Sequence, residues 1–140
     1  MAFCRRIAAL CIALFPACAQ DVDFNRQIRP ILSDKCYTCH GPDAANRKTK
    51  LRFDLEDFAK APLANGKLAI AAGHPEQSEL IARVTSANKG TRMPPAYMGK
   101  DALNPRDIEL LKTWIAQGAK WQPFWSFVPP QRPPVPAVRD

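Results

Sequence analysis

The sequence predicts an all-α fold with about three main helices. Three stretches, near residues 30–40, 75–87 and 105–117, carry apolar side chains at the i, i+3, i+4 spacing of an amphipathic helix. Residues typical of helix starts and stops flank each stretch. No segment shows a strong sheet pattern, and no internal repeat is visible. With 140 residues, the chain has the length of one domain.

The first predicted helix starts near Pro30, because proline suits the first position of a helix. Residues 24–28 extend this element upstream, with a break expected at the proline. Gly41-Pro42 is expected to end it. Its apolar face consists of Ile31, Leu32 and Cys36.

The second predicted helix begins near Pro75, and Glu76 in its first turn interacts favourably with the helix dipole. Residues 88–90, Asn-Lys-Gly, are expected to end it. Its buried face is predicted to be Leu80, Ile81 and Val84.

The third predicted helix has the clearest boundaries. Asn104 is a favoured N-cap, Pro105 suits the first turn, and Asp107 lies three residues after the cap. Gly118 is expected to close the helix. The face predicted to be buried is Ile108, Leu111 and Ile115, with Leu110 and Trp114 beside it.

Residues 46–73 give a weaker pattern. Residues 51–55 alternate like a short strand or an extended loop. Phe58 and Leu63 are expected to cover the edge of a bound cofactor.

Residues 1–19 have the pattern of a signal peptide. Arg5 and Arg6 precede an apolar stretch at 7–15, and residues 17–19, Ala-Cys-Ala, offer a cleavage site. The apolar stretch is too short to span a bilayer. A buried first helix, or a lipoprotein acylated at Cys18, is the alternative. We therefore expect an exported, periplasmic protein with a folded domain at residues 20–120.

Only two cysteines, Cys36 and Cys39, follow the expected cleavage point, and His40 follows them directly. This C-x-x-C-H motif is typical of c-type haem attachment. Two thiols at this spacing can reach the two vinyl groups of one porphyrin, and the histidine is then held under the iron as proximal ligand. A redox disulfide or a zinc site is the alternative, but no βαβ pattern and no second cysteine pair supports either. The predicted cofactor is one covalent haem c.

Met93 is the preferred candidate for the sixth iron ligand. Pro94 disfavours a helical conformation at Met93, and a second proline stiffens the loop. A thioether is a soft ligand that raises the haem potential. Met98 and His74 remain as alternatives, and a gap-filling core methionine is the competing role for Met93.

The net charge of +7 favours an acidic redox protein as partner, or loose peripheral contact with anionic lipid. The basic residues are scattered, so nucleic-acid binding is not expected. Residues 121–140 combine six prolines with four aromatic residues. They are expected to avoid a helix and to form either a strap on the domain or a linker to a further domain.

Several stretches resemble the planctomycete-type cytochrome c domain: residues 24–43, 73–81, 92–95 and 111–119, with 125–130 similar to the family's exit sequence. The resemblance implies a class I-like cytochrome c fold with a few helices around one haem. It also implies thioether bonds from Cys36 and Cys39, His40 as proximal ligand and Met93 as distal ligand. Family members usually continue into large domains, so it implies a truncated or standalone form, or a separately encoded partner.

One-electron transfer is the function that these features favour, with an electron-transfer protein expected rather than an enzyme. A redox-sensing or docking haem module of a larger assembly is the alternative. A peroxidase-like enzyme would need an open sixth position and distal acid–base groups, and the sequence has no spare histidine near Met93.

Overall fold

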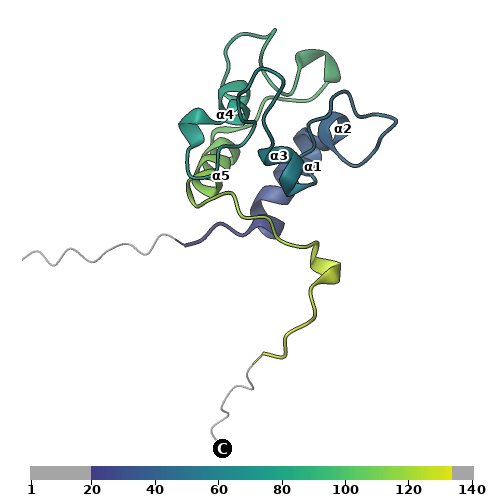
Figure 1. Cartoon of the computed structure of the whole chain (residues 1–140), viewed down its shortest axis with the longest axis vertical. Helices are drawn as coiled ribbons and strands as arrows, with labels where there is room; N and C mark the ends of the chain where they lie inside the picture. The colour runs from purple at the N-terminus through teal and green to yellow at the C-terminus, as the bar shows by residue number, and fades with distance from the viewer. Residues whose placement is uncertain (1–19, 134–140) are drawn as a thin grey trace, which may run out of the picture.

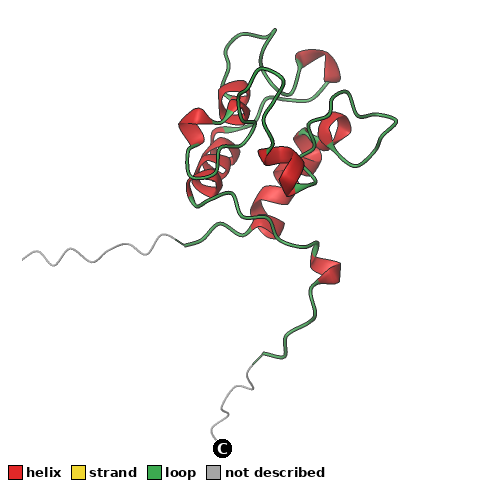
Figure 2. Cartoon of the chain, viewed as in Figure 1, coloured by secondary structure: helices red, strands yellow, loops and turns green. Residues whose placement is uncertain are grey.

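A computed structural model describes residues 20–133, and its regular elements are helical (Figure 2). Within residues 20–133 no β-strand occurs, and two isolated bridges pair Leu68 with Pro62 and Ser78. This agrees with the predicted all-α class. The expected signal peptide and residues 134–140 lie outside the described residues. In chain order the elements are η1 (Phe24–Ile28), α1 (Arg29–Lys35), α2 (Tyr37–His40), α3 (Glu56–Lys60), η2 (Pro75–Gln77), α4 (Glu79–Val84), η3 (Ala96–Met98), α5 (Pro105–Ala116) and η4 (Trp125–Phe127).

The first helical segment includes the upstream extension predicted at residues 24–28, but it breaks at a different residue than predicted. The π-helical turn η1 runs directly into α1, and the Asp23 carboxylate caps it by accepting a hydrogen bond from the backbone N–H of Arg26 (3.0 Å). Pro30 lies in the first turn of α1, where proline is tolerated, so the break expected there does not occur. The break is at Cys36, whose φ of −121° separates α1 from α2.

Gly41 ends α2, as predicted, because of a close approach between backbone segments. A Cβ at this position would lie 2.4 Å from the carbonyl oxygen of Tyr37, a separation that only glycine avoids. The chain therefore leaves the helix directly after His40.

The second predicted helix is shorter at both ends than the sequence suggests. A 3-10 turn, η2, occupies the predicted start, and α4 begins only at Glu79. Ser78 separates them because its buried hydroxyl accepts a hydrogen bond from the N–H of Ala71 (2.9 Å) and donates one to the carbonyl of His74 (3.0 Å). The helix ends at Val84, four residues before the predicted Asn88 turn. The predicted face Leu80, Ile81 and Val84 is buried.

Helix α5 confirms its predicted boundaries. The side chain of Asn104 accepts a hydrogen bond from the N–H of Asp107 (2.8 Å), and Gly118 adopts a φ of +94° just beyond the helix. Leu111, Trp114 and Ile115 are buried, and Ile108 and Leu110 are partly buried against the core.

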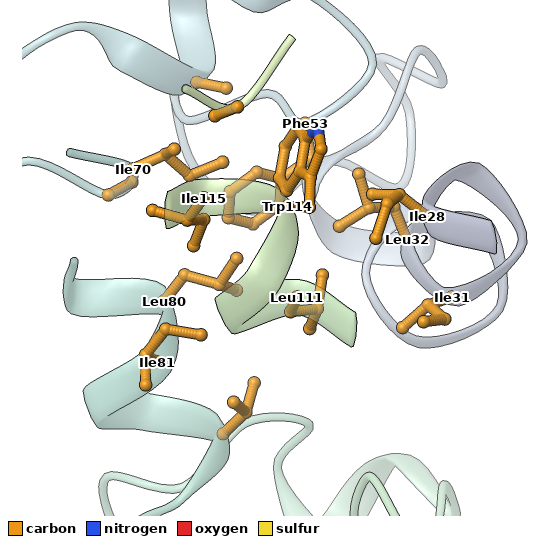
Figure 3. Packing of buried hydrophobic residues seen from close by; sticks show 14 of the residues in the cluster. Ile28, Ile31, Leu32, Phe53, Ile70, Leu80, Ile81, Leu111, Trp114 and Ile115 are labelled. Atoms are coloured by element: carbon orange, nitrogen blue, oxygen red, sulfur yellow. The ribbon is translucent and has the colours of Figure 1, made fainter. Parts of the chain in front are cut away.

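Helix α5 forms the centre of the core and packs against η1, η2 and α4. Figure 3 shows its buried residues between side chains of α4 on one side and of the N-terminal helix on the other. The Trp114 ring lies 5.6 Å from the ring of Phe24 and 4.7 Å from that of Trp121, measured between centroids. Three segments distant in sequence therefore meet at one tryptophan.

The segment 46–73 forms extended loops around α3, a helix that the sequence analysis did not predict. Residues 51–55 form a loop rather than a strand, the second of the two expected forms. Helix α3 has only five residues, which are too few for a helical period to be visible in the sequence.

The C-terminal segment begins as a strap on the N-terminal helix and then leaves the domain (Figure 1). Arg29 donates a hydrogen bond to the carbonyl of Gln122 (2.7 Å), and the Asn25 amide donates one to the carbonyl of Pro123 (2.8 Å). Beyond this contact, Phe127 is 81% exposed. The prolines do not prevent one 3-10 turn, η4, which the sequence analysis did not predict.

Candidate functional site

A cavity of about 870 Å³ brings together the residues that the sequence analysis selected. Cys36, Cys39, His40, Met93 and Met98 all line it. The volume lies within the range of roughly 300–1,000 Å³ that is usual for small-molecule and cofactor sites. A smaller groove of about 330 Å³ between α1 and α5 contains none of them.

The two cysteines are held on one turn of backbone. The carbonyl of Cys36 accepts hydrogen bonds from the N–H groups of Cys39 (3.1 Å) and His40 (2.9 Å). Residues three apart on a helical turn lie on the same face, so the C-x-x-C spacing presents both side chains to the cavity. Both are free thiols, not joined in a disulfide.

Burial raises the pKa of the Cys36 thiol to about 12. A redox-active C-x-x-C motif depends on the opposite shift, since its attacking cysteine must be a thiolate near neutral pH. Among residues 20–133, no group of three or more His, Cys, Asp or Glu side chains is placed to hold a metal ion. The raised pKa of Cys36 therefore does not match a redox-active C-x-x-C motif.

The ring of His40 contacts one hydroxyl and one aromatic ring. Its Nδ1 atom lies 3.1 Å from the hydroxyl oxygen of Thr49, and the Phe53 ring packs edge-on at 5.5 Å between centroids. Burial lowers the pKa of His40, and the Leu51 backbone opposes that shift in part. The net effect is a pKa below the usual value for histidine, so the imidazole is mostly neutral at pH 7, the form that ligates iron.

The Met93 side chain reaches the cavity from a loop tied to α4. Its backbone N–H donates a hydrogen bond to the carbonyl of Arg83 in the last turn of that helix (3.1 Å). The carbonyl of Asn88 closes the preceding turn by accepting hydrogen bonds from Thr91 (3.1 Å) and Arg92 (2.9 Å). The Met93–Pro94 peptide bond is cis. Backbone hydrogen bonds, together with the prolines, thus hold this loop on the cavity wall.

The two alternative iron ligands differ in their placement. Met98 also lines the cavity, at the end of η3, so position alone does not separate the two methionines. His74 does not line it; its side chain is 60% exposed, and its Nδ1 atom contacts the Glu76 carboxylate at 3.2 Å. The bis-histidine alternative therefore has no support from the structure.

The remaining walls of the cavity are largely apolar. Phe58 and Leu63 line it, as expected from the sequence; α4 and residues 49–53 also line it, which the sequence did not indicate. The α4 pattern predicted burial, and it could not show that part of this face borders a cavity. The apolar side chains on these walls are Leu51, Phe53, Phe58, Leu63, Leu80, Val84 and Leu103.

These residues fit a haem. Two thiols and an imidazole occupy one wall, thioethers are available from another segment, and apolar side chains would cover a flat apolar macrocycle. Thiols and imidazole come from one five-residue stretch, which matches the chemistry of covalent attachment.

Positive side chains predominate among the charged residues of the cavity. Five basic residues line it against one acid, Glu79. The pKa of Glu79 lies below its usual value because Lys67 and Arg83 donate hydrogen bonds to its carboxylate. The basic residues are Lys35, Lys48, Lys50, Arg83 and Lys100.

Most of these cations are already paired. Lys35 and Lys100 both contact the Asp34 carboxylate, at 3.0 and 3.3 Å. Lys48 and Lys50, in contrast, are exposed and form no ion pair within residues 20–133. The unneutralised positive charge at the cavity therefore lies on the loop that contains Thr49.

No helix in the described part of the chain has the length and apolar character needed to cross a membrane.

Residues 36–96 match the family described as Planctomycete cytochrome C, and this match supports a planctomycete-type cytochrome c domain. The matched segment starts at Cys36 and includes His40 and Met93. Such a domain implies covalently bound haem c and suggests electron transfer; cytochrome c domains are typically exported. No curated protein and no solved structure matches the chain.

Proposed function

We propose that this chain is a periplasmic electron-transfer protein that binds one haem c through Cys36 and Cys39, with His40 and Met93 as the iron ligands. The cavity carries the proposal, because it joins both thiols, the imidazole and a thioether within apolar walls. Bound haem supplies an iron that takes up and releases one electron at a time. The signal-peptide pattern at residues 1–19 supports export.

Each residue has a separate task in this proposal. Cys36 and Cys39 tether the macrocycle, so it cannot dissociate between electron-transfer events. His40 supplies a neutral imidazole nitrogen from the same turn. Met93 supplies a soft thioether, which favours ferrous iron and raises the potential. The apolar walls exclude water, which lowers the local dielectric around the iron.

Absorption spectra of the holoprotein test this assignment. The chain would be expressed with haem-maturation machinery, as wild type, Met93→Ala and Met98→Ala. We expect covalent low-spin haem and a weak far-red methionine–iron band in the wild type and in Met98→Ala, and loss of that band in Met93→Ala. Loss in Met98→Ala instead would assign Met98 as ligand, and a wild type without attached haem would refute the proposal.

We further propose that an acidic redox protein docks at the loop carrying Lys48 and Lys50. These exposed, unpaired cations border the cavity, and complementary charge speeds diffusional encounter. A Lys48→Glu/Lys50→Glu variant should exchange electrons with an acidic redox protein about tenfold more slowly at low salt. The difference should vanish near roughly 1 M salt, where the Debye length is about 3 Å.

A Lys89→Glu/Lys120→Glu variant is the matched control, since it changes the net charge equally with two exposed lysines that do not line the cavity. Equal slowing of both variants would show that only net charge matters and would contradict docking at the loop.

Docking within a larger assembly is a second candidate role, favoured by one observation. Phe127 and Val128, in the segment leading away from the domain, are 81% and 47% exposed. Deletion of residues 125–140 leaves the strap at Gln122 and Pro123 intact. If the shortened chain kept every partner in a pull-down, this role would be excluded.

A further inference from the structure

The loop after the haem motif returns to the same motif and places one hydroxyl against His40. The N–H of Lys48 donates to the carbonyl of Cys39 (3.0 Å), and the N–H of Phe53 donates to the carbonyl of His40 (2.8 Å). Between these two anchors, the Oγ1 atom of Thr49 lies 3.1 Å from Nδ1 of His40. The contact is therefore set by backbone hydrogen bonds on both sides of Thr49.

The hydrogen-bonding capacity of Thr49 allows it to accept a proton from the imidazole. A hydroxyl can accept two hydrogen bonds and donate one. One acceptor position is taken by the N–H of Leu51 (3.2 Å), which leaves the second for the Nδ1–H of His40. Thr49 contacts the Nδ1 atom of His40 and not Nε2.

We propose that Thr49 is a positioning residue for the proximal ligand, which holds the tautomer of His40 with its proton on Nδ1. This inference rests on the proposed haem-binding function. With the proton on Nδ1, the lone pair of Nε2 is available for iron, and the ring cannot rotate without losing the contact. The opposite tautomer would direct an N–H group at the metal and could not ligate it.

A hydrogen bond from Nδ1–H also changes the electron density of the ligand. An acceptor at this position makes the imidazole more basic, as outer-shell partners of metal-bound histidines generally do. A more basic imidazole stabilises ferric iron more than ferrous iron, because ferric iron carries the higher charge. Thr49 therefore lowers the reduction potential relative to a chain without the hydroxyl.

The test compares the reduction potentials of wild type, Thr49→Val and Thr49→Ser as holoproteins. Valine keeps the branched shape and removes the hydroxyl, whereas serine keeps the hydroxyl. We expect Thr49→Val to shift the ferric-to-ferrous equilibrium toward ferrous iron by up to about tenfold. For a one-electron couple, a tenfold shift raises the midpoint potential by about 59 mV. Thr49→Ser should restore the wild-type value.

Proton NMR of the reduced, diamagnetic protein provides a second readout. The Nδ1–H of His40 should exchange slowly with solvent in wild type and Thr49→Ser, and rapidly in Thr49→Val. The carbonyl of Leu51 is the rival acceptor, because the Leu51 backbone also acts on the ring. If the Leu51 carbonyl were the acceptor, Thr49→Val would change neither the midpoint potential nor the exchange rate of the Nδ1–H. This result would overturn the proposal.

Two outcomes separate this inference from the proposed function. If no haem attaches to the wild type, the proposed function fails before Thr49 is tested. If haem attaches and the wild-type Nδ1–H exchanges rapidly, only the role of Thr49 is refuted, whether or not the valine variant folds.

Discussion

Substituting alanine for Gly41 should destabilise the turn that carries Cys39 and His40, because the added methyl group has no space. The Cβ would lie 2.4 Å from the carbonyl oxygen, 2.6 Å from Cβ and 2.8 Å from Cα of Tyr37. Two of these atoms belong to the backbone of α2, which carries Cys39 and His40, and cannot move alone. The φ of Gly41 is −112°, so the cost comes from steric overlap alone.

The size of the effect follows from two opposing contributions. Forcing an extra methyl group into a packed site costs about 1–3 kcal/mol. Replacing glycine by alanine also restricts the unfolded chain, which offsets about 0.4–1 kcal/mol of that cost. A net loss of about 1–2 kcal/mol would lower the Tm of a domain near 100 residues by roughly 4–16 °C.

Thermal and urea unfolding of the holoprotein, followed by circular dichroism, measure this loss. Gly90→Ala is the matched control, because the nearest atom to its Cβ is the side-chain oxygen of Asn88 at 3.3 Å and its φ is not in the left-handed region. We expect the unfolding free energy of Gly90→Ala to equal or slightly exceed that of the wild type, with an unchanged urea m-value. If Gly41→Ala were as stable as Gly90→Ala, the close approach to Tyr37 would be refuted.

Three further predictions concern other parts of the domain. Asn104→Ala should lose about 1 kcal/mol of unfolding free energy, because the N–H of Asp107 loses its capping acceptor. Asn104→Asp should lose less, because aspartate also caps helices. The urea midpoints of the two variants measure this, and equal midpoints would exclude a capping role. Trp121→Ala should lose less unfolding free energy than the roughly 3–5 kcal/mol typical of truncating a fully buried aromatic residue, because Trp121 is only partly buried. A loss below about 0.5 kcal/mol, the level of a surface substitution, would show that the strap contributes no packing. Glu79→Gln should be less stable than wild type at neutral pH. The two cations lower the folded-state pKa of Glu79, so its contribution is present above the unfolded pKa of about 4.3 and is lost as pH falls through the folded pKa. Urea unfolding should show a smaller difference in unfolding free energy between wild type and Glu79→Gln at pH 3 than at pH 7. An equal difference at both pH values would contradict this ionic contribution.

The features predicted correctly from the sequence depend on residues close together in the chain. The ends of α5 require only Asn104, Asp107 and Gly118, within one helix and its caps. The C-x-x-C-H motif likewise places its three side chains within a single turn, as its spacing indicated. Local geometry of this kind is set by backbone stereochemistry and short-range hydrogen bonds.

The boundaries of α4 could not be predicted in the same way. Ser78 ends the preceding turn because its buried hydroxyl bonds to Ala71 and His74 in the loop that approaches it. The sequence indicates a continuous helix from Pro75, because the pattern of apolar residues does not reveal that approach. Helix α3 was missed for a related reason, since its single turn depends on the surrounding loops more than on its own periodicity.

The sequence by itself determined the helical class, the buried faces of α4 and α5 and the C-x-x-C-H motif for which we propose haem attachment, because each is encoded in residue types at short spacing. Only the tertiary structure decided that Met93 and Met98 reach the cavity while His74 does not, and that Thr49 contacts His40. These contacts join segments whose approach depends on the packing of the whole domain. The free energy of this packing sums the entropic cost of closing each loop and the gain from burying apolar surface. Because the sum runs over the entire chain, a local sequence pattern cannot predict it.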